Sequence, residues 1–325
     1  MTPTPRSSAV PLDAPPTSRQ ALPNLFLVGA PRSGTTMLHT CLAQHPEVFM
    51  SGVKEPHYFC TDVNEEFEAY QGGPTDPLFK HVDQYLRLFR DSGDRKVRGE
   101  SSVFYLYSDR ALRDIPAFNP EARAIVMLRE PLEFLRSMHA KLLWDGDEEC
   151  RDFERALDLE SERRAGRSLP PNVRFPSILF YSRYVAYAER LERCRASFGE
   201  ERVHVILLED FRRRPAEVWH GVLDFLGVAR IPLPAETDRN PNLEPRSLFV
   251  NRLLRERKRR RFWLRKRVRT VLERLNRRES PRRELAPDVV ARLRERFAPE
   301  VAALEASLGR DVRGPWGYRG EAEQK

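Results

Sequence analysis

The sequence has few cysteines and no cysteine pair of the kind that binds zinc. Its 325 residues include four cysteines, Cys41, Cys60, Cys150 and Cys194, and none of them forms a CxxC pair. A zinc ribbon or a thioredoxin-type redox site is therefore not expected. Scattered thiols in a chain of this length fit buried, reduced cysteines in a reducing compartment. His, Cys and Asp also form no cluster at ligand spacing, so we expect no metal.

Long apolar runs are missing as well. The longest, such as residues 25–28 and 205–208, are far too short to span a bilayer. The N-terminus lacks the apolar stretch of a secretory signal and is rich in Pro, Ser, Thr and Ala. We therefore expect a disordered leader over residues 1–22 and a single domain over residues 23–325. The expected location is the cytoplasm, with peripheral contact at the inner membrane face left open.

The positive charge of the chain is concentrated in one segment. Residues 252–278 contain 14 Lys and Arg against 2 Asp and Glu, a local balance of +12, whereas the whole chain carries +8. This pattern argues against a general surface for nucleic acid. Three interpretations of the segment stay open: contact with an anionic membrane, binding of an anionic acceptor or polyanion, and a solvated helix. In the third, the helix would pack through the apolar stripe Leu264, Val268, Val271, Leu272 and Leu275.

Short apolar runs alternate with helical patterns along the chain. The runs lack polar alternation, as is typical of strands buried on both faces of a parallel sheet, at residues 25–28, 48–50, 96–99, 124–128 and 203–207. Helical spacing marks residues 35–44, 182–197, 216–226 and 287–308. The alternation predicts an α/β fold, a three-layer sandwich around a central parallel sheet.

A phosphate-binding loop is indicated between the first strand and the first helix. Residues 29–36 read GAPRSGTT, with the GxxxxG spacing of a P-loop. Backbone N–H groups of such a loop and the helix behind it form a cradle for an anionic phosphate. The lysine that follows the second glycine in nucleotide triphosphatases is replaced by Thr35, and the cation of the loop is Arg32. This counts against hydrolysis of ATP or GTP.

A second anion site is indicated about a hundred residues later. The strand over residues 124–128 is followed by Arg129, at the end of the sheet where ligands of open α/β folds bind. Ser137 lies eight residues further on. An arginine and a hydroxyl can together hold a second, separate phosphate.

Residues 27–59 and 124–137 resemble the two nucleotide motifs of sulfotransferases that use 3′-phosphoadenosine 5′-phosphosulfate (PAPS). The likeness is nearer to the carbohydrate and tyrosyl-protein types than to the cytosolic small-molecule type. It implies a P-loop NTPase-like fold and transfer of a sulfuryl group from PAPS without a metal. It implies that Arg129 and Ser137 hold the 3′-phosphate. The same resemblance assigns the 5′-phosphosulfate to Arg32, Ser33, Gly34, Thr35 and Thr36.

The general base is expected in the segment KEPHYF, residues 54–59. Glu55 is similar in position to the base of the carbohydrate and tyrosyl-protein enzymes, and His57 is the runner-up. Glu100 and Ser102 are further candidates for the pocket, beside Ser101, which stands where the carbohydrate enzymes often carry a lysine. Arg246 lies in a segment that resembles a nucleotide-covering loop, and we expect it to reach the 3′-phosphate.

The expected reaction is sulfation of a hydroxyl, with an amine as the second choice, on a carbohydrate or a lipid-like small molecule. Two alternatives remain. One is another P-loop enzyme such as a nucleotide kinase, which would turn over ATP with Mg²⁺. The other is a nonenzymatic module that binds membranes or nucleic acid through its basic segment, although no specific nucleic acid is expected.

Overall fold

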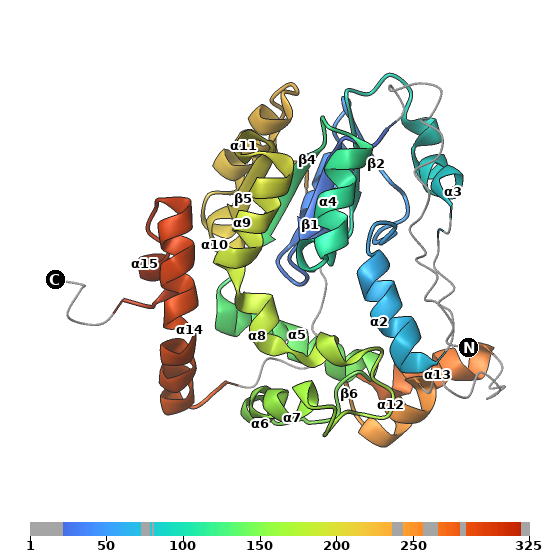
Figure 1. The fold of residues 1–325 in the computed structure, drawn as a ribbon, viewed down its shortest axis with the longest axis vertical. Helices are drawn as coiled ribbons and strands as arrows, with labels where there is room; N and C mark the ends of the chain where they lie inside the picture. The colour runs from blue at the N-terminus through green and yellow to red at the C-terminus, as the bar shows by residue number, and fades with distance from the viewer. Residues whose placement is uncertain are drawn as a thin grey trace, which may run out of the picture.

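The computed structural model describes residues 22–72, 79, 81–235, 243–255, 266–279 and 284–319. At its centre lies a parallel sheet of five strands in the order β2-β3-β1-β4-β5 (Figure 1). The strands are β1 (Leu25–Gly29), β2 (Val48–Met50), β3 (Val97–Ser101), β4 (Arg123–Leu128) and β5 (Val203–Leu207). The predicted parallel α/β sheet is confirmed, and each strand covers most of a predicted apolar run.

The helices cover both faces of this sheet and extend below it. They are α1 (Thr35–Ala43), α2 (Thr61–Gln71), α3 (Val82–Leu86), α4 (Asp109–Phe118), α5 (Pro131–Asp145), α6 (Phe153–Asp158), α7 (Glu160–Arg164), α8 (Tyr181–Val185), α9 (Tyr187–Phe198), α10 (Leu208–Arg213), α11 (Pro215–Leu226), α12 (Leu248–Arg255), α13 (Lys266–Asn276), α14 (Pro287–Leu308) and α15 (Arg313–Trp316). Short 3-10 helices are η2 (Arg87–Ser92), η3 (Tyr105–Tyr107), η4 (Pro176–Leu179) and η5 (Glu200–Arg202).

The alternating side chains of β1 divide the core into two layers. Leu25 and Leu27 pack with residues of α1 and α11 on one face of the sheet. Phe26 and Val28 pack with α4, α9 and α14 on the other face. Successive side chains of a strand point to opposite faces, so an all-apolar run requires cover on both sides. The result is the expected three-layer sandwich.

The basic segment is divided among several elements and is not one helix. It takes in the second half of α12 and all of α13, and its end enters strand β7 (Arg277–Glu279), which pairs antiparallel with β6 (Leu243–Pro245). Of the predicted apolar stripe, Val271 is 53% exposed and Leu275 is 67% exposed. Val271 and Leu275 therefore do not pack as the solvated-helix interpretation, one of the three left open, requires. Leu264 of the stripe, and all of the predicted leader except Leu22, lie outside the described residues.

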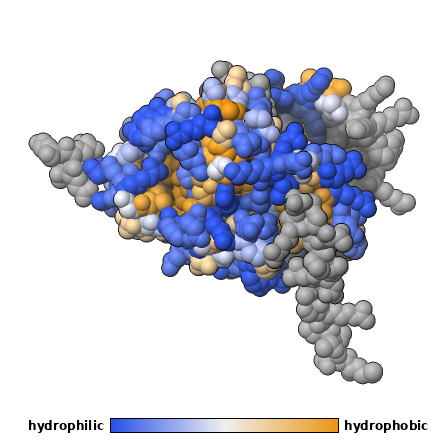
Figure 2. All heavy atoms as spheres, turned by 90° about the horizontal axis from the view of Figure 1, so that it is seen from above, coloured by the Kyte–Doolittle hydropathy of each residue, from blue (hydrophilic) through white to orange (hydrophobic). Residues whose placement is uncertain are grey.

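No helix within the described ranges combines the length and the apolar character needed to cross a membrane. The face of the molecule seen from above in Figure 2 is mostly hydrophilic, with small apolar patches between the charged side chains. This agrees with the 32% of charged residues in the chain.

Candidate active site

The phosphate loop joins β1 to α1 and is shaped by close packing. Gly34 has φ 92° and precedes the first turn of α1. A Cβ atom at Gly34 would be strained by this φ value and would lie 2.9 Å from Leu208 Cδ1, so the leucine side chain would have to shift. Arg32 also has a left-handed backbone, with φ 61°. The loop thus turns its backbone toward the N-terminus of α1, the geometry on which anion binding by such loops depends.

The two predicted anion motifs meet in space. The Nε atom of Arg32 donates a hydrogen bond to Ser137 Oγ at 3.0 Å, although the residues lie 105 positions apart. Arg129 Nη1 donates to the carbonyl oxygen of Arg32 at 3.3 Å, and its Nη2 donates to Glu133 at 3.0 Å. Arg129 and Ser137 are 4% and 2% exposed. These hydrogen bonds therefore fix the positions of the Arg32 and Arg129 side chains.

Burial and mutual repulsion act on the charge of the loop arginine. Desolvation and the nearby charge of Arg129 lower the pKa of Arg32 below its ordinary value. The carboxylates of Asp145 and Glu55 act in the opposite direction. Two guanidinium groups brought together in this way form a strongly electropositive site for an anion.

The predicted base lies on the loop that follows β2. The backbone N–H of Glu55 donates to the carbonyl of Ser101 at 2.8 Å, and that of His57 donates to Ser102 Oγ at 3.0 Å. His57 Nε2 lies 3.5 Å from Glu55 Oε2. Burial alone would raise the pKa of Glu55. The hydrogen bond and charge of His57, with the charges of Lys54 and Lys141, outweigh it and hold that pKa below 4.5.

Lys54, next to the predicted base, is a site residue that the sequence interpretation missed. Its Nζ donates to Thr36 Oγ1 of the phosphate loop and lies 3.7 Å from Glu55 Oε1. These two contacts place the ammonium group of Lys54 between the loop and the carboxylate, although the position equivalent to the usual lysine is Ser101. Burial and the charge of Lys54 also lower the pKa of His39 to about 4, so this imidazole is neutral at physiological pH.

Glu100 and Ser102 lie beneath the site and not in it, which corrects the expectation that they line the pocket. Both are fully buried. The carboxylate of Glu100 accepts hydrogen bonds from Tyr85, Tyr105 and Ser102 at 2.9, 2.8 and 2.6 Å. Burial raises the pKa of Glu100 despite these donors. Because Ser102 also accepts from the backbone of His57, the network anchors the loop that carries Glu55.

A cavity of about 510 Å³ connects these groups at the carboxyl end of the sheet. Of the predicted site residues, those that line it are Arg32, Gly34, Thr35, Thr36, Glu55, Arg129 and Ser137. The side chain of Ser33 is buried and donates to the carbonyl of Pro31 at 3.4 Å. The cavity lining includes neither His57, which lies behind Glu55, nor Arg246, whose Nε donates to the carbonyl of Arg277.

Charged residues complete the far side of the cavity. Lys141 and Asp145 follow Ser137 at intervals of four on α5, a spacing that places all three on one helix face. This spacing could have identified Lys141 and Asp145 as site residues from the sequence. Arg174, which pairs with Asp145 and Asp147, comes from an irregular segment and carried no such signal. Six basic side chains and two acidic ones thus line the cavity: Arg32, Lys54, Arg129, Lys141, Arg174, Arg212, Glu55 and Asp145.

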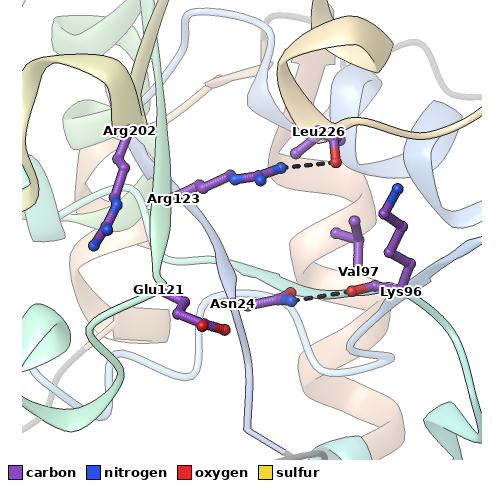
Figure 3. Close-up of a pocket in the computed structure, with 7 residues that line it drawn as sticks. All are labelled: Asn24, Lys96, Val97, Glu121, Arg123, Arg202 and Leu226. Carbon is purple, nitrogen blue, oxygen red and sulfur yellow. Dashed lines mark hydrogen bonds between the residues drawn. The ribbon is translucent and has the colours of Figure 1, made fainter.

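A second cavity, of about 360 Å³, lies at the amino end of the sheet (Figure 3). Its basic residues donate to backbone carbonyls. Arg123 donates to Phe225 and Leu226 at 3.0 and 2.7 Å, Lys96 donates to Gly227, and Arg202 donates to Pro120. Arg123 and Lys96 therefore cap the C-terminus of α11, whose carbonyls carry partial negative charge. We assign this cavity a structural role.

Metal-binding clusters were sought in the same part of the chain. His, Cys, Asp and Glu nowhere gather in groups of three that could hold an ion among the described residues. We therefore assign no residue to a metal.

Comparison with known proteins shows which class of enzyme this chain resembles. Residues 23–85 match the model of the sulfotransferase family. A crystal structure of a sulfotransferase from Alicyclobacillus acidocaldarius superimposes with a TM-score of 0.66 and 26% identity, covering 91% of this chain and 99% of that one. The chain resembles the sulfotransferase family over these residues and in its fold, in agreement with the resemblance inferred from the motifs.

Curated relatives are similar over part of their length. Carbohydrate sulfotransferase 15 of Mus musculus is 26% identical over 73% of this chain and 51% of its own. The bifunctional heparan sulfate N-deacetylase/N-sulfotransferase 1 of Caenorhabditis briggsae is 24% identical over 73% of this chain and 26% of its own. The chain thus spans about half or less of the length of these relatives.

Proposed function

We propose that this protein transfers a sulfuryl group from PAPS to a hydroxyl group of an acceptor, with an amine as the second choice. The observation that carries the proposal is the meeting of Arg32, Arg129, Ser137 and Glu55 around one cavity. The cavity thus brings together a phosphate-binding loop, a second basic site and a carboxylate. The names of the curated relatives support a carbohydrate-like acceptor.

The cavity fits the donor in size and charge. Its volume of about 510 Å³ is within the usual range for small-molecule sites, roughly 300–1,000 Å³. The 5′-phosphosulfate would be held by the loop amides and by the side chains of Arg32, Thr35 and Thr36. Ser33 would contribute its backbone N–H, because its side chain is buried. Arg129 and Ser137 would hold the 3′-phosphate, with a positive environment suited to two separate anionic groups.

Glu55 would accept the proton of the acceptor. The new bond joins the acceptor oxygen to sulfur, the bond between sulfur and the 5′-phosphate oxygen breaks, and the proton moves to the carboxylate. Since the pKa of Glu55 lies below its ordinary value, the carboxylate is ionised and able to act as a base throughout the neutral range. Lys54 and Arg32 would stabilise the negative charge that develops on the leaving phosphate.

The alternatives receive less support. A kinase with a P-loop uses a lysine after the second glycine, and Thr35 occupies that position here. Similarity to sulfotransferases in sequence and fold also disfavours a nonenzymatic module. A nonenzymatic module would also leave the carboxylate of Glu55, which lines the cavity, without a role.

Calorimetry with adenosine 3′,5′-bisphosphate, AMP and ATP tests the donor assignment. We expect the bisphosphate to bind much more tightly than the other two, and equal affinity for AMP would contradict a separate 3′-phosphate site. Acceptors can then be screened with labelled PAPS, using Arg32→Ala as the negative control. Transfer of label that the control retains would refute the proposed site, whereas ATP turnover with Mg²⁺ would favour a kinase.

A further inference from the structure

The large apolar side chains that are exposed in the described part of the chain all lie on α12 and α13. They are Phe249, Val271 and Leu275, with exposed fractions of 71%, 53% and 67%. Val271 and Leu275 are four residues apart on α13 and therefore share one helix face. Exposed apolar groups gathered on neighbouring elements usually mark an interaction surface.

These side chains are exposed because the inner side of the two helices is already anchored. Asn251 of α12 donates to the carbonyls of Leu143 and Trp144 at 2.8 and 3.2 Å. Asn276, which ends α13, accepts from the backbone of Ser247 at 2.8 Å and donates to its carbonyl at 3.2 Å. Both asparagines are buried, and so is Leu254. The exposed face is thus a fixed outer surface of the domain.

Basic residues surround this apolar surface. Arg246, Arg252, Arg274 and Arg277 are exposed on or beside the two helices. The acidic partner recorded for Arg252 is Glu149, at 3.9 Å, a distance typical of a weak surface pair. The whole segment over residues 252–278 carries a balance of +12. The sequence of this segment therefore contains far more basic than acidic residues.

We propose that the outer face of α12 and α13, formed by Phe249, Val271, Leu275 and the surrounding arginines, binds the surface of an anionic lipid bilayer. Apolar side chains enter the boundary between headgroups and acyl chains, and arginines contact the anionic headgroups. A polyanionic chain would use the arginines but leave the three apolar groups in water. A second copy of this chain would place two strongly positive surfaces against each other.

The proposed membrane-binding face is connected to the cavity through α5. Asn251 binds the carbonyls at the C-terminal end of α5, and Lys141 and Asp145 of the same helix line the cavity. In Figure 1, α12 and α13 lie at the end of the molecule opposite the face seen in Figure 2. A protein bound through this face would hold the end of the cavity lined by Lys141 and Asp145 near the lipid surface.

Sedimentation with vesicles tests the proposal on the full chain. We expect binding to phosphatidylcholine vesicles that contain phosphatidylglycerol, and little binding to phosphatidylcholine alone. Phe249→Ser with Leu275→Ser should weaken binding by roughly tenfold or more, because both side chains would otherwise leave water. Arg252→Gln with Arg274→Gln should weaken it by roughly fivefold per arginine, an effect that fades at high salt.

The matched control changes the same net charge on another surface. Arg113 and Arg230 are exposed to 70% and 62% and lie outside α12 and α13. Arg113→Gln with Arg230→Gln should leave vesicle binding unchanged. Thermal midpoints and affinity for adenosine 3′,5′-bisphosphate should stay constant in all variants. The comparison of the two vesicle types uses the unmodified protein and does not depend on the folding of any variant.

Three results would overturn the proposal. One is equal or absent binding of the unmodified protein to both kinds of vesicle. Another is full binding by the serine variant together with displacement by a soluble polyanion, which would indicate a polyanion site. The third is a dimer in light scattering that the serine variant abolishes, without vesicle binding, which would indicate contact between two copies.

Discussion

The two ends of the central sheet carry cavities that are both rich in basic residues, yet their cations have different partners. At the amino end, Arg123 and Lys96 donate to the backbone carbonyls at the end of α11. At the carboxyl end, Arg32 and Lys54 donate to the hydroxyls of Ser137 and Thr36. A hydroxyl can exchange such a partner for a ligand, whereas a helix terminus needs its cap. The partners of the charges, more than their number, distinguish a binding site from a structural one.

The largest expected effect that separates the two ends is loss of the carboxylate base. Glu55→Gln should lower turnover by roughly 10²–10⁴-fold and change affinity for adenosine 3′,5′-bisphosphate little, because a base acts mainly in the transition state. Since the pKa of Glu55 is held below 4.5, activity of the unmodified enzyme should fall only as the pH drops below that value. Kinetics across a pH series provide the measurement.

His57→Ala is the control for this assignment. It should retain turnover, with the acidic limb of the pH profile moved upward, because His57 is the main group that lowers the pKa of Glu55. An inactive His57→Ala beside an active Glu55→Gln would transfer the role of base to His57. An acidic limb near pH 6.5, the ordinary value of an imidazole, would point the same way.

The next effect concerns the second phosphate. Arg129→Ala should erase the preference for adenosine 3′,5′-bisphosphate over AMP, with a loss of about 2–4 kcal/mol, because a buried charged contact is removed. Arg123→Ala is the matched change at the amino end of the sheet and should leave this preference intact. Calorimetry with adenosine 3′,5′-bisphosphate and AMP measures this preference in both variants. An equal loss in both variants would mean that the two ends do not differ in function.

A smaller effect is expected at Lys54. Lys54→Met keeps most of the length of the side chain and removes its charge. It should lower turnover by roughly 10–100-fold, since one cation near the leaving group is lost. The pKa of Glu55 should also rise, moving the acidic limb of the profile upward. Lys96→Met, at the other end of the sheet, should leave turnover and profile unchanged. An unchanged profile in Lys54→Met would show that the ammonium group does not act on Glu55.

The smallest expected effect is a loss of folding stability without a change in turnover. Arg123→Met removes two hydrogen bonds to the end of α11 and should lower the free energy of unfolding by about 1–3 kcal/mol. Turnover per folded molecule should stay the same. Denaturant unfolding measured beside initial rates separates the two quantities. Reduced turnover without a stability change would contradict the structural role of this cavity.

The sequence predicted those parts of the fold and site that depend on local pattern. Buried parallel strands are short and apolar throughout, and the glycine spacing of the phosphate loop is local too, so both were predictable. Arg174 reaches the cavity through an irregular segment that no period describes. The burial of Glu100 depends on Tyr85 and Tyr105, which come from other elements. The helical period of the apolar stripe also could not show that Val271 and Leu275 would be exposed to solvent.

The backbone of the candidate site limits how this protein can evolve. Arg32, Glu55 and His57 have φ values of 61°, 58° and 51°, in a region that costs an ordinary L-residue on the order of 1 kcal/mol or more. Glycine or asparagine would relax the chain at each position. A population selected only for heat resistance should therefore accumulate those two residues at positions 32, 55 and 57. Selection for turnover would keep Arg32 and Glu55 but not His57, so the two pressures would oppose each other at positions 32 and 55.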